Sequence, residues 1–291
     1  MRAAARWLMM AMLAVARPAG AAQLLVPAYF YPNATGTNYW NDLATAAHVA
    51  PLVAILNPNS GPGASADPQY VAALAQLHAA GGKVIGYVST NYGNRSAALV
   101  QADVDQYASL YAVDGIFVDE MSNLAADVAY YASLYSYIKG KSAAWSVVGN
   151  PGTNTLEDYL KPATRGADAL VIFEDDAGNY AGFTPAAWTA GYSADHFAAI
   201  IHTQASATGM LVNLSSLGAQ HVGRVFVTDD VLSNPYDTLP AYWSNEVLEV
   251  APAITLDPQG GGAFGGAGVL MMFLGLRRLK KAPSASEKYC V

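Results

Sequence analysis

Several acidic residues in this sequence follow short apolar segments, at points where a buried strand would end. The segment "VDGIFVDE" closes on Asp119 and Glu120, and "VIFED" closes on Glu174. A charge buried without a partner costs several kcal/mol. These carboxylates must therefore be exposed to water, paired with another group or part of a functional site. Two carboxylates close together can serve as acid and base, because their repulsion raises the pKa of one of them. Capping of the helices that follow is the alternative interpretation.

Other polar and aromatic residues follow similar apolar segments and could hydrogen-bond to a ligand or stack on it. The candidates for ligand binding are Tyr29, Tyr31, Asn57, Asn59, Tyr87, Tyr92, Asn150 and His202. The Asn-Pro-Asn and Gly-Pro-Gly sequences within 57–63 are equally typical of plain turns. His202 is also expected as a structural histidine. Asp229 and Asp230 are interpreted as caps of a loop or helix.

No metal or cofactor site is predicted. The five histidines, at positions 48, 78, 196, 202 and 221, show neither an HExxH motif nor any other short paired spacing. The first apolar segments lack a glycine-rich dinucleotide fingerprint. A metal-dependent deacetylase is therefore disfavoured, and chemistry by side chains alone is expected.

The segments that would position these residues number eight. They are 24–30, 53–58, 83–89, 115–120, 146–151, 169–175, 197–203 and 224–230. Each is short and apolar, and longer helix-like stretches separate them, which is the pattern of repeated βα units. Eight units in about 235 residues predict an α/β protein with a single (β/α)8 TIM-type barrel. An open doubly wound sheet is the competing architecture.

Helix signals occur between these segments. Starts are predicted at Asp67-Pro68, Ser96 and Thr184-Pro185, and ends at Gly81-Gly82 and Gly140. Large side chains at helical spacing are expected to pack in the core: Leu124, Val128, Tyr131, Leu134 and Tyr137.

In a barrel of this type the carboxyl ends of the strands form the active face. Neighbouring strands lie about 4.8 Å apart, so segments 115–120 and 169–175 would stand about 10 Å apart. Carboxylates reaching inward from both could approach to about 5–5.5 Å, the separation of retaining glycosidases, or to 6.5–9.5 Å, that of inverting ones.

Five segments in order resemble the spherulation-specific (spherulin-4) family, glycoside hydrolase family 135. They are "AILNPNSGPG", "GYVSTNYG", "VDGIFVDE", "GNPGT" and "VIFED", and the resemblance covers most of residues 24–250. It implies a (β/α)8 barrel. It also implies hydrolysis of galactosaminogalactan, an α-1,4-linked polymer of galactose and N-acetylgalactosamine that is partly deacetylated and so cationic.

The same resemblance assigns roles to the acids. The family's functional acids match Asp119, Glu120 and Glu174, and their placement is also similar to α-galactosidase-type barrels. It implies Asp119 as nucleophile, Glu174 as acid/base and Glu120 as a supporting carboxylate, with the first two roles open to exchange. The hypothesis is a cofactor-free, endo-acting, galactosaminidase-like hydrolase of an exopolysaccharide. The alternative is a sugar-binding or surface-coat barrel without turnover.

Both ends of the chain are interpreted as targeting segments around a barrel domain at 23–257. Residues 1–22 carry Arg2 and Arg6, an apolar stretch and small residues, the layout of a signal peptide; a buried helix is the alternative. Residues 258–291 contain glycines, about fourteen apolar residues and a basic cluster. They resemble a bacterial GlyGly-type sorting tail, which implies a transient membrane anchor that a rhomboid-like protease cuts. The polar ending "APSASEKYCV" departs from that pattern.

The charge of residues 23–257 limits the class of partner. This part has seven Lys and Arg against 21 Asp and Glu, a formal net charge of −14. Such a surface repels nucleic acid and anionic lipid and favours neutral or cationic ligands. The single cysteine, Cys290, lies in the tail, so an exported domain would use no disulfide. We expect an exported monomer whose partner is a polysaccharide.

Overall fold

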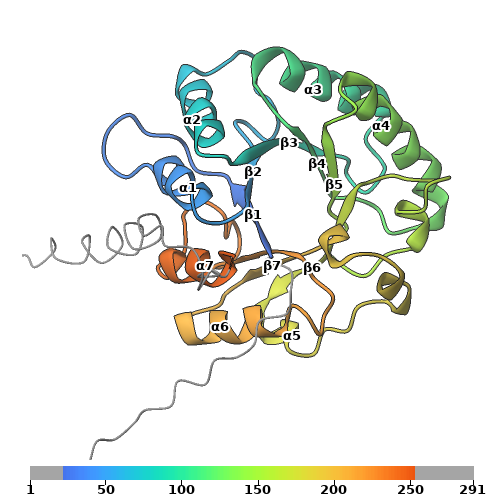
Figure 1. Ribbon diagram of the computed structural model, residues 1–291. Coiled ribbons are helices and arrows are strands. Elements are labelled where there is room, and N and C mark those ends of the chain that lie inside the picture. Colours follow the sequence, from blue (N-terminus) through green and yellow to red (C-terminus); the bar gives the residue numbers. More distant parts are fainter. Residues whose placement is uncertain (1–21, 253–291) are drawn as a thin grey trace, which may run out of the picture. The chain divides into compact units, whose positions relative to one another are not determined.

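Eight parallel strands pair in sequence order, and β8 closes on β1 (Figure 1). The computed structural model describes residues 22–252. The strands are β1 (Gln23–Ala28), β2 (Leu52–Leu56), β3 (Lys83–Ser89), β4 (Gly115–Asp119), β5 (Ser146–Gly149), β6 (Ala169–Asp176), β7 (Phe197–His202) and β8 (Arg224–Val227). They coincide with the eight apolar segments to within a few residues, so the predicted (β/α)8 barrel is confirmed.

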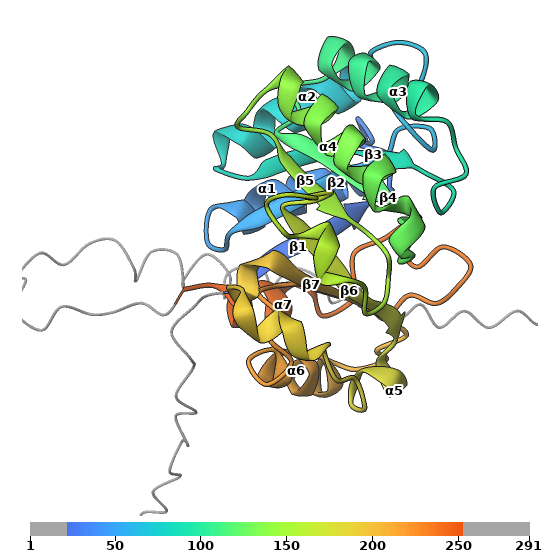
Figure 2. The same cartoon turned by 90° about the vertical axis from the view of Figure 1, so that its right-hand side faces the viewer.

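Helices surround the strands on the outside of the barrel, as the end-on and side views show (Figures 1 and 2). The α-helices are α1 (Tyr39–Ala47), α2 (Pro68–Ala79), α3 (Ala97–Leu110), α4 (Val128–Lys141), α5 (Ala177–Tyr180), α6 (Ala207–Ser216) and α7 (Trp243–Val250). The 3-10 helices are η1 (Ala125–Asp127), η2 (Glu157–Tyr159), η3 (Ala187–Gly191) and η4 (Ala194–His196). The β5–β6 connection has only η2, so one of the eight units lacks an α-helix.

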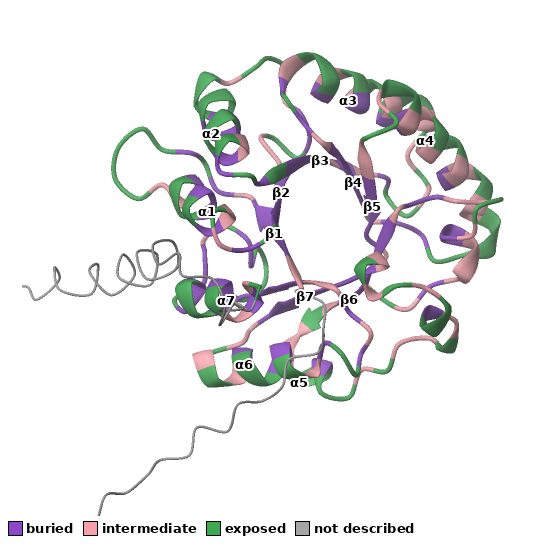
Figure 3. Ribbon diagram, in the orientation of Figure 1, coloured by how far each residue is buried: buried purple, intermediate pink, exposed green. Residues whose placement is uncertain are grey.

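Most strand residues are coloured as buried in Figure 3. They are buried because helices cover the outer face of such a barrel and side chains fill its interior. All five residues of β2 and all six of β7 are buried. This double burial explains why the strands read as continuous apolar runs rather than as alternating patterns.

Two of the helix starts follow the predicted signals. Asp67 accepts a hydrogen bond from the Gln69 amide at 2.8 Å, and Pro68 takes the first helical position of α2. Ser96 precedes α3 but makes no side-chain cap. Helix α4 runs to Lys141, one residue past Gly140.

Two predictions about the helical parts are wrong. Thr184-Pro185 begins no α-helix, because the Asn154 side chain binds the Thr184 carbonyl and the Ala186 amide, each at 2.9 Å. The Thr184 carbonyl is the acceptor that the first intrahelical hydrogen bond would use. Leu124 is not a core residue: it precedes η1, and its side chain is 61% exposed.

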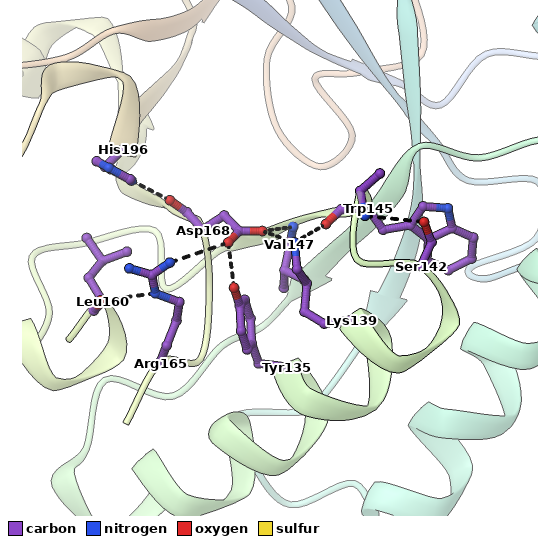
Figure 4. Close-up of polar contacts among 10 residues, drawn as sticks. Tyr135, Lys139, Ser142, Trp145, Val147, Leu160, Arg165, Asp168 and His196 are labelled. Carbon is purple, nitrogen blue, oxygen red and sulfur yellow. Dashed lines mark hydrogen bonds and ion pairs between the residues drawn. The ribbon is translucent and has the colours of Figure 1, made fainter. Parts of the chain in front are cut away.

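At the amino end of β6, the Asp168 carboxylate collects contacts from several elements (Figure 4). It accepts hydrogen bonds from the Tyr135 hydroxyl at 2.7 Å and the Val147 amide at 2.9 Å. Lys139 Nζ lies 3.4 Å away and the Arg165 guanidinium 3.9 Å away. These contacts connect α4, β5 and the segment before β6.

The targeting segments predicted for the two ends, 1–21 of the leader and 258–291 of the tail, lie outside the described residues. Within residues 22–252, no helix has the length and apolar character needed to cross a membrane.

Candidate active site

A cavity of about 580 Å³ opens at the carboxyl ends of the strands. Its lining comes from the ends of β4, β6 and β7 and from the loops after β1, β3, β5 and β8. The lining residues are Tyr29, Tyr92, Asp119, Glu120, Asn150, Pro151, Gly152, Glu174, Asp175, His202, Leu232, Ser233, Asn234, Pro235 and Tyr236. The cavity therefore lies where the fold predicts an active site.

One amide group joins the two predicted carboxylates. Asn150 Nδ2 donates to Asp119 Oδ1 at 2.8 Å and to Glu174 Oε2 at 2.6 Å. Because one nitrogen reaches both oxygens, those oxygens lie no farther apart than the two distances together, about 5.4 Å. The strands that carry these acids, β4 and β6, have β5 between them, and Asn150 follows β5 directly.

The Asn150 side chain is itself fixed by backbone contacts. The backbone amide of Asn150 donates to the Val118 carbonyl at 2.8 Å, and the backbone carbonyl of Asn150 accepts from the Met121 amide at 2.9 Å. Its side-chain oxygen accepts from the Gly152 amide at 3.0 Å, which orients Nδ2 toward the acids. Gly152 has φ +65°, a left-handed conformation that favours glycine.

Each carboxylate also has one tyrosine. The Tyr236 hydroxyl donates to Glu174 Oε1, and the Tyr87 hydroxyl hydrogen-bonds to Asp119. The Tyr29 ring packs edge-on against both of these rings, with centroids 5.7 Å from Tyr87 and 5.6 Å from Tyr236. The three tyrosine rings thus pack together, and two of them hydrogen-bond to the two acids.

No ion pair reaches these acids within residues 22–252. Burial, and next the repulsion from Glu174, raise the pKa of Asp119 to about 6. Hydrogen bonds from Tyr87 and Asn150 act in the opposite direction and limit the rise. Burial and the neighbouring carboxylates raise the pKa of Tyr87 and Tyr236, so both phenols stay protonated. The pair is therefore disposed to share a single proton at mildly acidic pH.

Glu120 lies in a strained turn beside the pair. Strand β4 ends at Asp119, and Glu120 has φ +48°, which is uncommon for a residue with a side chain. Ser89, the last residue of β3, donates its hydroxyl to Glu120 Oε2. Such strain is frequent at functional sites, and here it lets two successive carboxylates line one cavity.

A bulge in β6 precedes Glu174. The pairing of β6 with β7 shifts between Val171 and Phe173, so Ile172 is an extra residue in the ladder. Bulges re-aim the side chains that follow them and are frequent next to active sites. Glu174 then faces the cavity, and its amide donates to the Gly152 carbonyl at 2.9 Å.

The structure brings together most of the predicted site residues, but not all. Asp119, Glu120, Glu174, Asn150, Tyr92 and His202 line the cavity, and Tyr87 lies outside its lining but hydrogen-bonds to Asp119. Tyr31, Asn57 and Asn59 are absent from its lining. The Tyr31 hydroxyl donates to Asp67 at 3.0 Å, and Asn57 Oδ1 accepts from the Gly61 amide at 2.8 Å. The turn interpretation of 57–63 fits these contacts.

Two contributions to the site were missed from the sequence. Tyr236 comes from the irregular β8–α7 loop. Its only distinguishing feature in the sequence is that it is an aromatic residue in a segment with prolines. Ser89 ends an apolar strand without any distinguishing pattern. Asp229 and Asp230 cap that same loop: Asp229 accepts from the Ala241 amide at 3.2 Å, and Asp230 from the Thr238 hydroxyl at 2.5 Å.

Metal binding has no evident place among the described residues. Within 22–252, no group of three or more His, Cys, Asp or Glu side chains is arranged to hold a metal ion. His202 lines the cavity singly, with Nδ1 2.9 Å from the Thr203 hydroxyl.

Comparison with known proteins identifies the family. The profile of spherulation-specific family 4 matches residues 23–250. The chain belongs to this family. Spherulin-4 from Physarum polycephalum is 37% identical over 239 residues, which span 78% of this chain and 70% of that relative. The family predicted from the five sequence segments is thus confirmed.

A solved structure also resembles this family member. Sph3 from Aspergillus clavatus, crystallised in complex with GalNAc, has a TM-score of 0.68 and 25% sequence identity. The alignment covers 80% of this chain and 99% of the Sph3 chain, so nearly all of Sph3 is matched.

Proposed function

We propose that this protein is a glycoside hydrolase that uses Asp119 and Glu174 on either side of a glycosidic bond. The observation that carries the proposal is the single Asn150 amide that binds both carboxylates. It holds the two bonded oxygens no more than about 5.4 Å apart, which is compatible with the spacing of about 5–5.5 Å in retaining glycosidases and lies below the 6.5–9.5 Å of inverting ones.

The mechanism that fits this spacing has two steps. Asp119 attacks the anomeric carbon while Glu174 protonates the departing oxygen, which leaves a glycosyl ester on Asp119. Glu174, now ionised, then removes a proton from water, and the water oxygen displaces Asp119 and restores both groups. We assign attack to Asp119 because the family resemblance implies it; Asn150 and one tyrosine hold each acid in the same way, so the exchanged roles would have the same spacing.

The reaction needs one proton on the pair, and burial together with charge repulsion retains it. Burial, and next the repulsion from Glu174, raise the pKa of Asp119 to about 6, so the pair holds a proton below that pH; the mechanism requires this proton on Glu174 when the glycosidic bond breaks. Glu120 and its Ser89 partner then provide a further negative group near the positive charge that develops on the sugar ring.

For the substrate, we propose an exopolysaccharide that contains α-1,4-linked galactosamine or N-acetylgalactosamine. The family membership and the GalNAc complex of Sph3 support this class. The acidic domain also suits a polymer that carries positive charge. We further propose that the protein is exported, on the basis of the leader sequence; sequencing the amino terminus of the secreted form would test this.

The function is tested by reducing-end release from a partly deacetylated α-1,4-linked N-acetylgalactosamine polymer. We expect release by the wild type, and loss of about a thousandfold or more in Asp119→Asn and Glu174→Gln. Asp105→Asn is the matched control and should retain the wild-type rate. Asp105 is exposed on α3 and pairs with Lys141 of α4. Binding of the polymer by the wild type with no release would favour the sugar-binding barrel instead.

A further inference from the structure

A second hollow adjoins the candidate active site. It measures about 600 Å³ and shares Tyr92 and Pro151 with the first cavity. Its walls come from the loops after β3, β4 and β5, so it continues the opening along the same rim of the barrel. The two-step mechanism uses none of the residues that line only this hollow.

The walls combine apolar faces with unused hydrogen-bonding groups. Tyr92 is 59% exposed and Leu124 is 61% exposed, although both belong to types that burial would stabilise. Among the described residues, the side chains of Asn123 and Thr153 make no hydrogen bond, and both line the hollow. Apolar surface next to free amide and hydroxyl groups is the mixture that binds a sugar ring.

These exposed residues are held in place by their backbones. The Leu124 carbonyl accepts from the Tyr159 hydroxyl at 2.6 Å, and its amide donates to Ser122 Oγ at 3.2 Å. Tyr92 has φ +54°, and its amide donates to the Glu120 carbonyl at 2.7 Å. The fold therefore presents both side chains outward, in a surface formed before any ligand binds.

The hollow carries one charged group, Asp127. Ser122 Oγ donates to its Oδ2 at 2.6 Å, and within residues 22–252 no hydrogen bond reaches Oδ1. The nearby cation of the β3–α3 loop, Arg95, is occupied by Asp103 at 2.7 Å and by the Ser89 carbonyl at 3.0 Å. An uncompensated carboxylate in a sugar-sized hollow favours a ligand with a positive group.

We propose that the second hollow is a saccharide subsite adjoining the catalytic pair, and that Asp127 there binds the protonated amine of a galactosamine unit. The inference rests on the proposed function, because it takes the polymer to be the ligand of the first cavity. The chain would cross Tyr92 and Pro151, so that one sugar lies at the carboxylates while another lies against Leu124.

Binding in an inactive background separates this inference from the proposed function. The Asp119→Asn variant is titrated by calorimetry with two α-1,4-linked N-acetylgalactosamine oligosaccharides, one fully acetylated and one partly deacetylated. We expect the deacetylated oligosaccharide to bind more tightly, and this preference to weaken as salt is raised. Adding Asp127→Asn should reduce the ratio of the two affinities about fivefold. Wild-type turnover is measured separately and tests only the proposed function.

Leu124→Ser tests the apolar wall in the same assay. It should weaken both oligosaccharides about fivefold, while Val212→Ser should leave binding unchanged. Val212 is the matched control because it is 62% exposed on α6 and lines neither cavity. An unchanged ratio of affinities in the Asp127→Asn variant, together with a salt-independent preference, would overturn the proposal.

Discussion

Strand β6 has a carboxylate near each end, Asp168 just before its first residue and Glu174 near its last. Glu174 comes six positions after Asp168, or about 20 Å along an extended strand. At the amino end, Asp168 is compensated by a lysine, an arginine, a phenol and a backbone amide (Figure 4). At the carboxyl end, Glu174 has a phenol and a shared amide, and its nearest charged neighbour is another carboxylate.

The comparison separates acids that stabilise the barrel from acids that do chemistry. A carboxylate with cationic and hydrogen-bonding partners lowers the free energy of the folded state, as at the stability face of such barrels. A carboxylate pair without cations raises the free energy of the folded state. Such a pair is kept where catalysis uses the proton that it holds. Four variants test whether this difference is correct.

The largest effect is expected at the uncompensated end. Asp119→Asn should reduce turnover by about a thousandfold or more while making the protein more stable above pH 6. Folding raises the pKa of Asp119 from 3.8 to about 6, so its favourable contribution is present below pH 3.8 and is lost as pH rises through 6. Removing the charge should therefore add up to about 3 kcal/mol to the free energy of unfolding at pH 8. Urea denaturation at pH 8 checks this, and a destabilised variant would contradict the comparison.

The opposite outcome is expected at the compensated end. Asp168→Ala leaves the Val147 amide and the Tyr135 hydroxyl without their acceptor, and should lower the free energy of unfolding by about 2–4 kcal/mol. Turnover per folded molecule should not change. Asp158→Ala is the control, since Asp158 pairs with Lys161 on the surface and its loss should cost no more than about 1 kcal/mol. Equal losses in the two variants would refute a special role for the Asp168 contacts.

A smaller effect is expected at the amide between the acids. The reaction needs one proton on the pair, so kcat/KM should fall about tenfold per pH unit above pH 6. Asn150 lowers the pKa of Asp119, so Asn150→Ala should move this alkaline limb to higher pH and reduce the maximum about 10- to 100-fold. Rate profiles between pH 4 and pH 9 measure both. If Asn150→Ala reduces the rate but leaves the alkaline limb at the same pH, the Asn150 amide contacts only the substrate and does not lower the pKa of Asp119.

The smallest effect is expected at another acid, Glu246, which is shielded from solvent and has no cationic partner among the described residues. Glu246 of α7 is fully buried; its Oε1 accepts from the Val227 amide at 2.8 Å, and its Oε2 has no partner within the described residues. Burial raises its pKa well above the ordinary value, so its contribution to stability is present below pH 4.5 and is lost as pH rises through the folded-state pKa. Glu246→Gln should change stability by less than about 1 kcal/mol at pH 6 and should stabilise at alkaline pH. Thermal melts at pH 6 and pH 10 test this; strong destabilisation at pH 6 would show that Glu246 is ionised.

Much of the fold was predictable because its pattern is local. Strands covered on both faces give uninterrupted apolar runs, and polar residues begin where each strand reaches solvent. That change of polarity located Asp119, Asn150 and Glu174 at one rim. The failure at Thr184-Pro185 has a non-local cause, since the distant Asn154 binds the Thr184 carbonyl, the acceptor that the first helical hydrogen bond would use.

The rest of the site depends on contacts that a sequence pattern does not encode. Tyr236 reaches Glu174 across 62 residues from a loop without periodicity. The bulge at Ile172 lies inside a uniformly apolar run, so nothing local marks it. Leu124 has helical spacing to Tyr131 but precedes the helix, and a hydrogen bond from Tyr159 fixes its carbonyl.

The most direct test of the central claim is to locate a covalent sugar on the protein. In Glu174→Gln, a fluoride of an N-acetylgalactosamine oligosaccharide needs no protonation to react, whereas the second step lacks its base, so a glycosyl ester should accumulate. The proposed roles predict, by peptide mass spectrometry, one added saccharide on Asp119. A saccharide on another residue, or continued turnover with no adduct, would contradict them.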